Sequence, residues 1–138
     1  MFAPNTKFLV VDDYATMRKI VRKILTDLGY TRIEEADDGK PAFELVKTAQ
    51  AAKDPFGCVI SDWNMPGMTG LEFLRAVRAN PETKTLPFLL ATAEGDQSNV
   101  VEAAKAGVSD YVIKPFTPTT LTEKLKKAFA RHNKTQAA

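Results

Sequence analysis

Three aspartates follow apolar, strand-like runs and have no histidine beside them. Asp12 and Asp13 come directly after the run FLVV (8–11), and Asp62 comes directly after the run FGCVIS (56–61). An ionised carboxylate is already a nucleophile and needs no general base to activate it. The chemistry that these residues suggest is the transfer of a phosphoryl group to an aspartate, which depends mainly on positioning and on charge stabilisation.

Two further polar residues end apolar runs. Thr92 ends the run PFLLAT (87–92), and Lys114 ends the run DYVIK (110–114). In open parallel sheets, ligands bind beyond the carboxyl ends of the strands, near the point where the strand order reverses. We therefore expect the three carboxylates, the hydroxyl and the ammonium group to meet at one edge of a sheet.

Such a cluster calls for a cation. Carboxylates a few ångströms apart repel one another by about 4 kcal/mol for each close pair at an effective dielectric constant near 20. Oxygen ligands with room for water suit Mg²⁺. Cys58 is the only cysteine and His132 the only histidine, so no cluster of soft ligands competes for zinc. Taken singly, each residue also fits an ordinary role, because aspartates at strand ends often form turns or helix caps.

The elements that must position these residues alternate along the chain. Strand patterns cover residues 8–11, 32–36, 56–61, 87–92 and 110–114. Helical patterns lie between them, over residues 17–28, from 38 to about 49, 70–79, 98–106 and from 117 onward. In the first helix, six apolar residues recur at helical spacing and should face the core: Met17, Ile20, Val21, Ile24, Leu25 and Leu28. Five βα units predict a parallel sheet covered on both faces, with right-handed crossovers.

Composition narrows the function further. The chain has 138 residues, 44% of them hydrophobic, which suits a single domain with its own core. Its net charge of +2 lacks the basic excess of a typical nucleic-acid binder. No apolar run approaches the 18 or so residues of a membrane span. The absence of a possible internal disulfide suits the cytoplasm.

Four stretches together resemble the signature sequences of a known family. FLVVDD, VISDWNMPGMTGLE, LLATAE and DYVIKPFT are similar to the corresponding stretches of receiver domains of two-component response regulators, especially the single-domain chemotaxis members. The resemblance implies a flavodoxin-like (βα)5 fold, a doubly wound five-stranded parallel sheet with strand order 2-1-3-4-5. It implies one receiver domain over residues 6–132, with flexible ends at 1–5 and 133–138.

The resemblance also implies a role for each site residue. Asp62 is the expected phospho-acceptor, with Lys114 and Thr92 contacting the phosphoryl group. The expected ligands of Mg²⁺ are Asp13, Asp62 and the backbone carbonyl of Asn64, with Asp12 acting through water. Thr92 and Tyr111 form the expected switch, although Tyr111 alone could equally be a static aromatic. Asn64 and Glu94 lie near the path of an attacking water and are expected to tune dephosphorylation.

The expected partner-binding face lies on the last strand and the helices beside it. Its residues are Val100, Ala104, Tyr111, Thr117, Lys124 and Lys127. Its lysines also fit an ordinary solvated helix face. The segment AEGDQSN (93–99) borders this face and is acidic where the best-known relatives carry lysines, so it bears on partner choice.

The function implied is a bacterial chemotaxis switch rather than an enzyme, catalysing only its own phosphorylation and dephosphorylation. A histidine kinase or a small acyl phosphate is the expected donor, and the flagellar motor switch protein is the expected partner of the phosphorylated form. We expect a cytoplasmic monomer that binds no nucleic acid and inserts in no membrane; an auxiliary phosphatase is left open.

Other readings stay open at this point. A phosphate sink, a phosphorelay intermediate or a regulator of a non-flagellar partner would share every site residue. A phosphatase with an aspartyl nucleophile needs a second carboxylate two residues on, where this chain has Asn64. A flavodoxin-like cofactor carrier needs a Ser/Thr/Gly-rich loop after the first strand, where this chain has Asp-Asp-Tyr (12–14). Little sequence follows the last helix to form a DNA-binding domain.

Overall fold

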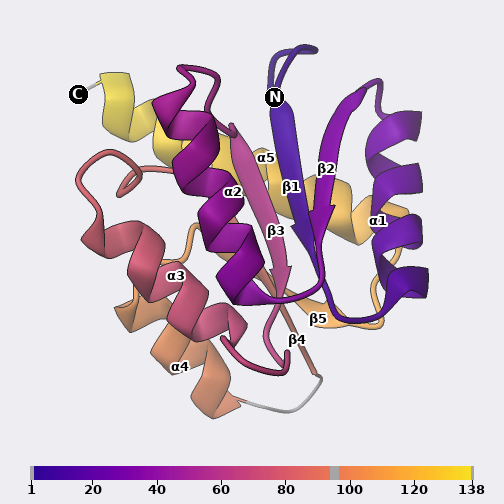
Figure 1. Cartoon of the computed structure of the whole chain (residues 1–138). Coiled ribbons are helices and arrows are strands. Elements are labelled where there is room, and N and C mark those ends of the chain that lie inside the picture. Colours follow the sequence, from indigo (N-terminus) through magenta and orange to yellow (C-terminus); the bar gives the residue numbers. More distant parts are fainter. Residues whose placement is uncertain (1, 94–96, 138) are drawn as a thin grey trace.

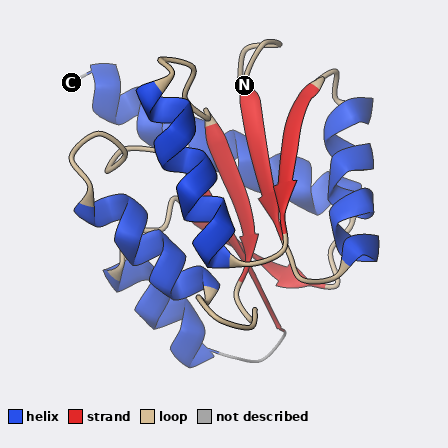
Figure 2. Cartoon of the chain, viewed as in Figure 1, coloured by secondary structure: helices blue, strands red, loops and turns tan. Residues whose placement is uncertain are grey.

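A computed structural model of the chain describes the backbone of residues 2–93 and 97–137, and the side chains of residues 2–92 and 100–131. Its strands are β1 (Lys7–Val11), β2 (Arg32–Ala36), β3 (Cys58–Asp62), β4 (Phe88–Ala93) and β5 (Asp110–Lys114). Its helices are α1 (Ala15–Asp27), α2 (Gly39–Ala51), α3 (Gly70–Ala79), α4 (Gln97–Lys105) and α5 (Pro118–Ala137). The strands form one parallel sheet with the order β2-β1-β3-β4-β5, which confirms the expected fold (Figure 2).

The sheet is covered on both faces, so its central strands are apolar throughout instead of alternating. Helices α1 and α5 lie on one face, and α2, α3 and α4 lie on the other (Figure 1). Strand β1 serves both cores: Phe8 and Val10 pack toward α1 and α5, whereas Leu9 and Val11 pack toward α2 and α3. All four side chains are almost completely buried.

Two strands begin one or two residues later than the sequence predicts. Strand β3 begins at Cys58 because it pairs there with Phe8, while Phe56 is buried in the connection before it. Strand β4 begins at Phe88 because Pro87 has no N–H to donate, although its carbonyl accepts a bond of 2.9 Å from the amide of Val59.

The predicted inner face of α1 is too wide. Val21, Ile24 and Leu25 are buried, but Ile20 is 46% exposed and Leu28 is 39% exposed. Ile20 lies at the margin of the apolar stripe, about 100° around the helix from Val21. Leu28 is the C-cap residue, past the last turn that packs on the sheet.

Residues outside the expected domain of residues 6–132 also belong to the fold. The ring of Phe2 makes edge-to-face contacts with Phe8 and Phe129, at centroid distances of 5.6 and 5.1 Å. The hydroxyl of Tyr30 donates a hydrogen bond of 2.9 Å to the carbonyl of Phe2. At the other end, α5 extends to Ala137. The first segment is ordered because burying an aromatic ring stabilises it.

Helix α3 begins against the last residue of β3. The amide of Gly70 donates a hydrogen bond of 2.9 Å to the carbonyl of Trp63. A Cβ atom on Gly70 would lie 2.1 Å from the backbone carbonyl oxygen of Asp62, so only glycine allows this approach.

We therefore expect Gly70→Ala to destabilise the protein by about 3 kcal/mol, the upper end of the usual cost of overpacking. Urea unfolding would measure it. Gly57→Ala is the matched control, because a Cβ there meets chiefly a methyl group of the Thr6 side chain, which can move. Equal losses of stability in the two variants would show that the close contact with Asp62 is not what makes Gly70→Ala destabilising.

Candidate functional site

The three expected carboxylates meet at one edge of the sheet. Strands β1 and β3 are the neighbours between which the strand order reverses. Their register pairs Val11 with Ser61, so Asp12 and Asp62 leave the two strands side by side. One carboxylate oxygen from each of Asp12, Asp13 and Asp62 lies within 4.8 Å of the other two.

Lys114, from the edge strand β5, bridges two of these carboxylates. It is the last residue of β5, and its Nζ lies 3.0 Å from Oδ2 of Asp12 and 3.0 Å from Oδ1 of Asp62. Asp12 and Asp62 are buried, and Lys114 is three-quarters buried, so solvent screens these pairs little. One ammonium group thus pairs with two of the three clustered carboxylates.

Backbone amides orient the same carboxylates. The amide of Tyr14 donates to Oδ1 of Asp12 at 2.9 Å, and the amide of Trp63 donates to Oδ1 of Asp62 at 2.8 Å. The guanidinium group of Arg18 donates to the backbone carbonyl of Asp12 at 2.6 Å. The loop beyond each strand therefore positions the carboxylate that precedes it.

The electrostatics favour an added cation. Burial raises the pKa of Asp62, and the charge of Asp12 raises it further, although Lys114 partly opposes both effects. Burial alone would lower the pKa of Lys114, but the pairs with Asp62 and Asp12 outweigh it and hold that pKa above its ordinary value. The ammonium group is therefore charged at neutral pH, and it does not fully relieve the cost of ionising Asp62.

The donor set fits Mg²⁺. All three side chains offer carboxylate oxygens, and Asp13 is exposed while Asp12 and Asp62 are buried, so the cluster opens to solvent on one side. Mg²⁺ typically binds one or two carboxylates and keeps several of its waters, which an open cluster of this kind permits.

The remaining expected site residues lie around this cluster. Thr92 is buried near the end of β4, one residue beyond Ala91, which pairs with Asp62. Asn64 is exposed, in the loop that follows Asp62. Glu94 lies outside the described residues.

The expected partner-binding residues lie on α4, β5 and α5. Val100, Ala104, Tyr111 and Lys127 line one groove over these elements. The Nζ of Lys124 lies 5.0 Å from the centroid of the Tyr111 ring, a cation–π contact. Thr117 is exposed just before α5 and accepts a hydrogen bond of 3.1 Å from the amide of Thr120, as a capping residue does.

The helix predicted over residues 70–79 is α3, but the capping box at its start escaped the sequence analysis. The hydroxyl of Thr69 accepts a bond from the amide of Glu72, and the carboxylate of Glu72 accepts one from the amide of Thr69. This capping box fixes where the loop after Asp62 ends and α3 begins. Its signal, a threonine followed three residues later by a glutamate, was present in the sequence.

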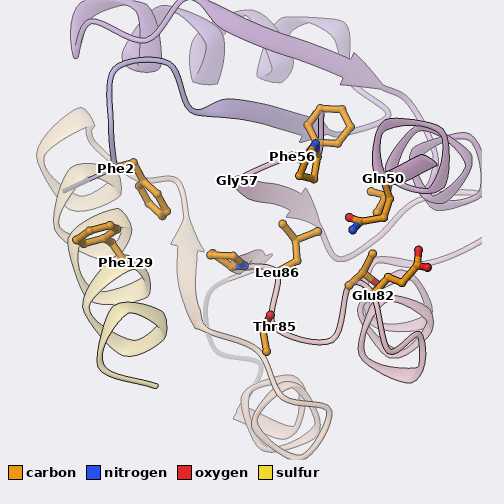
Figure 3. Close-up of a pocket in the computed structure, with 12 residues that line it drawn as sticks. Phe2, Gln50, Phe56, Gly57, Glu82, Thr85, Leu86 and Phe129 are labelled. Atoms are coloured by element: carbon orange, nitrogen blue, oxygen red, sulfur yellow. The ribbon is translucent and has the colours of Figure 1, made fainter. Parts of the chain in front are cut away.

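A separate hollow lies at the opposite, amino ends of the strands. It has a volume of about 350 Å³ and is lined by apolar side chains that include Phe2, Phe56 and Phe129, and by polar side chains that include Gln50 and Glu82 (Figure 3). None of the three clustered aspartates lines it. The carboxylate cluster, not this hollow, has the groups for phosphoryl chemistry.

A doubly wound parallel sheet with clustered carboxylates and a lysine at its carboxyl edge defines an aspartate phospho-acceptor domain. Comparisons with known proteins agree. Residues 8–126 match the model of the response regulator receiver domain. The chain is 50% identical to the chemotaxis protein CheY-3 of Vibrio cholerae over 127 residues, covering 92% of this chain and 94% of that protein. It is 49% identical to the chemotaxis protein CheY of Pseudomonas aeruginosa, covering 92% and 98% of the two chains.

A solved structure is similar too. The chemotaxis response regulator CheY4 of Vibrio cholerae superposes with a TM-score of 0.77 at 39% identity, covering 90% of this chain and 98% of that one. The chain belongs to the response regulator receiver domain family.

Membership makes this protein a phosphorylation-dependent signalling domain with a histidine kinase as partner, and not a conventional enzyme. Among the described residues, no helix combines the length and the apolar character that a membrane span requires.

The raised pKa of Asp62 predicts how stability depends on pH. Without metal, the folded state binds the proton of Asp62 more tightly than the unfolded state does, so ionisation costs stability as the pH rises through the carboxyl range. Asp62→Asn removes this cost and keeps an oxygen that can accept from Lys114. We expect the variant to be more stable than the wild type at pH 7 in chelator, with the difference shrinking in acid.

Thermal unfolding across pH 3–8 measures this difference. Asp27→Asn, which changes an exposed carboxylate outside the cluster, serves as the control. A stability gain for Asp62→Asn that stays constant across this range would contradict the prediction.

Proposed function

We propose that the protein is a cytoplasmic, monomeric chemotaxis response regulator with one receiver domain over residues 6–132. A histidine kinase phosphorylates Asp62 in a Mg²⁺-dependent reaction, and the phosphorylated form binds the flagellar motor switch. The observation that carries this proposal is the cluster of Asp12, Asp13 and Asp62 with Lys114 bridging two of its members. The similarity to chemotaxis proteins named CheY over nearly the whole chain supports the chemotaxis assignment.

In the proposed reaction, a carboxylate oxygen of Asp62 attacks the phosphorus atom, and the bond from phosphorus to the donor breaks. The donor is the phosphohistidine of the kinase, whose imidazole leaves, or an acyl phosphate, whose carboxylate leaves. Lys114 already lies against Asp62 and stabilises the negative charge of the transferred group, and the Thr92 hydroxyl hydrogen-bonds one of its oxygens. Mg²⁺ held by the clustered carboxylates would supply further neutralising charge for the transferred group.

We assign the Mg²⁺ ligands to Asp13, Asp62 and the backbone carbonyl of Asn64, with Asp12 contributing through water. The clustered oxygens of the three aspartates support this set. We assign Asn64 and Glu94 to control of the dephosphorylation rate, the role that the family resemblance implies for them; Asn64 is exposed in the loop after Asp62.

The output follows from the added charge. Phosphorylation adds about −1.5 to −2 charge at neutral pH. Thr92 and Tyr111, on the neighbouring strands β4 and β5, form the proposed switch that carries this change to the partner-binding residues. The groove that Val100, Ala104, Tyr111 and Lys127 line supports this location. Thr117 and Lys124 complete the proposed face.

Acetyl phosphate with Mg²⁺ should add one phosphoryl group to the wild type by mass spectrometry and none to Asp62→Asn. Asp27→Asn is the matched control and should be labelled like the wild type. Labelling retained in the Asp62 variant would refute the assignment of the phospho-acceptor.

Mg²⁺ alone should change the fluorescence of Trp63, the only tryptophan. Trp63 directly follows Asp62, and its amide donates a hydrogen bond to the Asp62 carboxylate. We expect Asp13→Asn to weaken the apparent Mg²⁺ affinity at least about tenfold, since it removes a charged ligand. A flat titration of the wild type would count against metal binding at this edge.

A pull-down with phosphorylated and unphosphorylated protein separates the possible outputs. Capture of the motor switch by the phosphorylated form alone supports the proposal. Phosphoryl transfer onward to a second histidine protein, without motor capture, would instead indicate a relay or a phosphate sink.

A further inference from the structure

The loop after Asp62 is closed at its two ends. It runs from Trp63 to Thr69 and contains Asn64. At its start, the amide of Trp63 donates to the carbonyl of Ala91 at 2.9 Å, and at its end the amide of Gly70 donates to the carbonyl of Trp63 at 2.9 Å. Met65, within the loop, is buried in the core.

The second half is held by a residue from a different connection, 30 positions earlier in the chain. Asp38 lies between β2 and α2, and its Oδ1 accepts a hydrogen bond of 3.1 Å from the amide of Met68. In the opposite direction, the amide of Gly39 donates to the carbonyl of Met68 at 3.3 Å. The two connections are thus bridged through the backbone of one loop residue.

The backbone at Gly67 is shaped around the same carboxylate. Gly67 has a φ of +74°, in the left-handed region, and a Cβ there would lie 2.5 Å from Oδ2 of Asp38. The loop therefore approaches Asp38 closely along both Gly67 and Met68. Only a residue without a side chain adopts this conformation at this distance without strain.

We infer that Asp38 is a positioning residue for the Mg²⁺ site, which it holds by fixing the loop that presents the Asn64 carbonyl. This inference rests on the proposed function, in which that carbonyl is a ligand. A carbonyl has no side-chain freedom, so its direction is set entirely by the backbone of the loop. Outer-shell groups that orient metal ligands typically change metal affinity by about 10- to 100-fold when they are lost.

Asp38 also caps α2, and a test must separate the two roles. Its Oδ1 accepts from the amide of Lys40 at 3.1 Å, which satisfies the helix N-terminus. Asp38→Ser keeps a good capping oxygen, but serine is one atom shorter and cannot reach Met68 as well. Asp38→Asn keeps an oxygen in the place of Oδ1 for both bonds and removes only the charge.

The experiment titrates Mg²⁺ into the full chain and follows Trp63 fluorescence in four proteins: wild type, Asp38→Ser, Asp38→Asn and Asp37→Ser. Asp37 is exposed and adjacent, so its variant is the control for loss of a nearby charge. We expect a rise of about tenfold in the apparent Kd for Asp38→Ser. We expect near wild-type values for Asp38→Asn and Asp37→Ser, and similar thermal unfolding of all four proteins in chelator.

Hydrogen exchange in chelator gives a readout without metal. The amide of Met68 should be protected in the wild type and in Asp38→Asn and should exchange faster in Asp38→Ser. Unchanged Mg²⁺ affinity in Asp38→Ser would overturn the inference, and so would an equal loss in Asp38→Asn, which would indicate charge instead of position. If the wild type gives no Mg²⁺ response, the proposed function itself fails, and the exchange of Met68 still tests the bridge.

Discussion

The candidate site depends on a fold that holds negatively charged carboxylates close together. Asp12 and Asp62 leave neighbouring parallel strands side by side, and Asp13 brings a third carboxylate within 4.8 Å of both. Left alone, such a cluster would repel itself apart or take up protons. The apolar strands β1 and β3 resist this, because moving either one would disturb cores on both faces of the sheet. The same burial that stabilises the fold holds the carboxylates together, and the site therefore favours binding of a cation.

The ammonium group of Lys114 supplies part of the positive charge that the carboxylates require. Its two ion pairs leave the cluster with one positive charge against three negative charges. The site is therefore held together before any metal arrives, yet it keeps a negative excess. In the proposed reaction, the same ammonium group would both hold the carboxylates in place and stabilise a phosphoryl group on Asp62.

Much of this arrangement could be predicted from the sequence, because it follows from strand ends. Parallel strands place their carboxyl ends at one edge, so Asp12, Asp62 and Lys114 had to lie near one another once the βα alternation was recognised. The strand order came from the family resemblance and not from the residues. The width of the buried face of α1 was wrong, since periodicity does not tell how much of a stripe the sheet covers, as Ile20 and Leu28 illustrate.

Contacts between loops could not be predicted in the same way. Asp38 reads in the sequence as the cap of a helix, which it is, but nothing in its neighbourhood signals a bond to Met68. The close approach of Gly70 to Asp62 could not be predicted from the sequence either, because a glycine at the start of a helix has many explanations. Such contacts depend on how two connections meet in space, and only the folded chain contains that information.

Strand β5 contains Lys114, which pairs with Asp12 and Asp62, and, three residues earlier, Tyr111 of the proposed partner-binding face. At roughly 3.3 Å per residue, these two positions are about 10 Å apart along a single strand. In the proposed function, a signal would therefore travel only a short way along β5, which ends at the carboxylate cluster and carries the half-buried Tyr111. The proposed switch of Thr92 and Tyr111 therefore has only a short distance to span between the site and the surface.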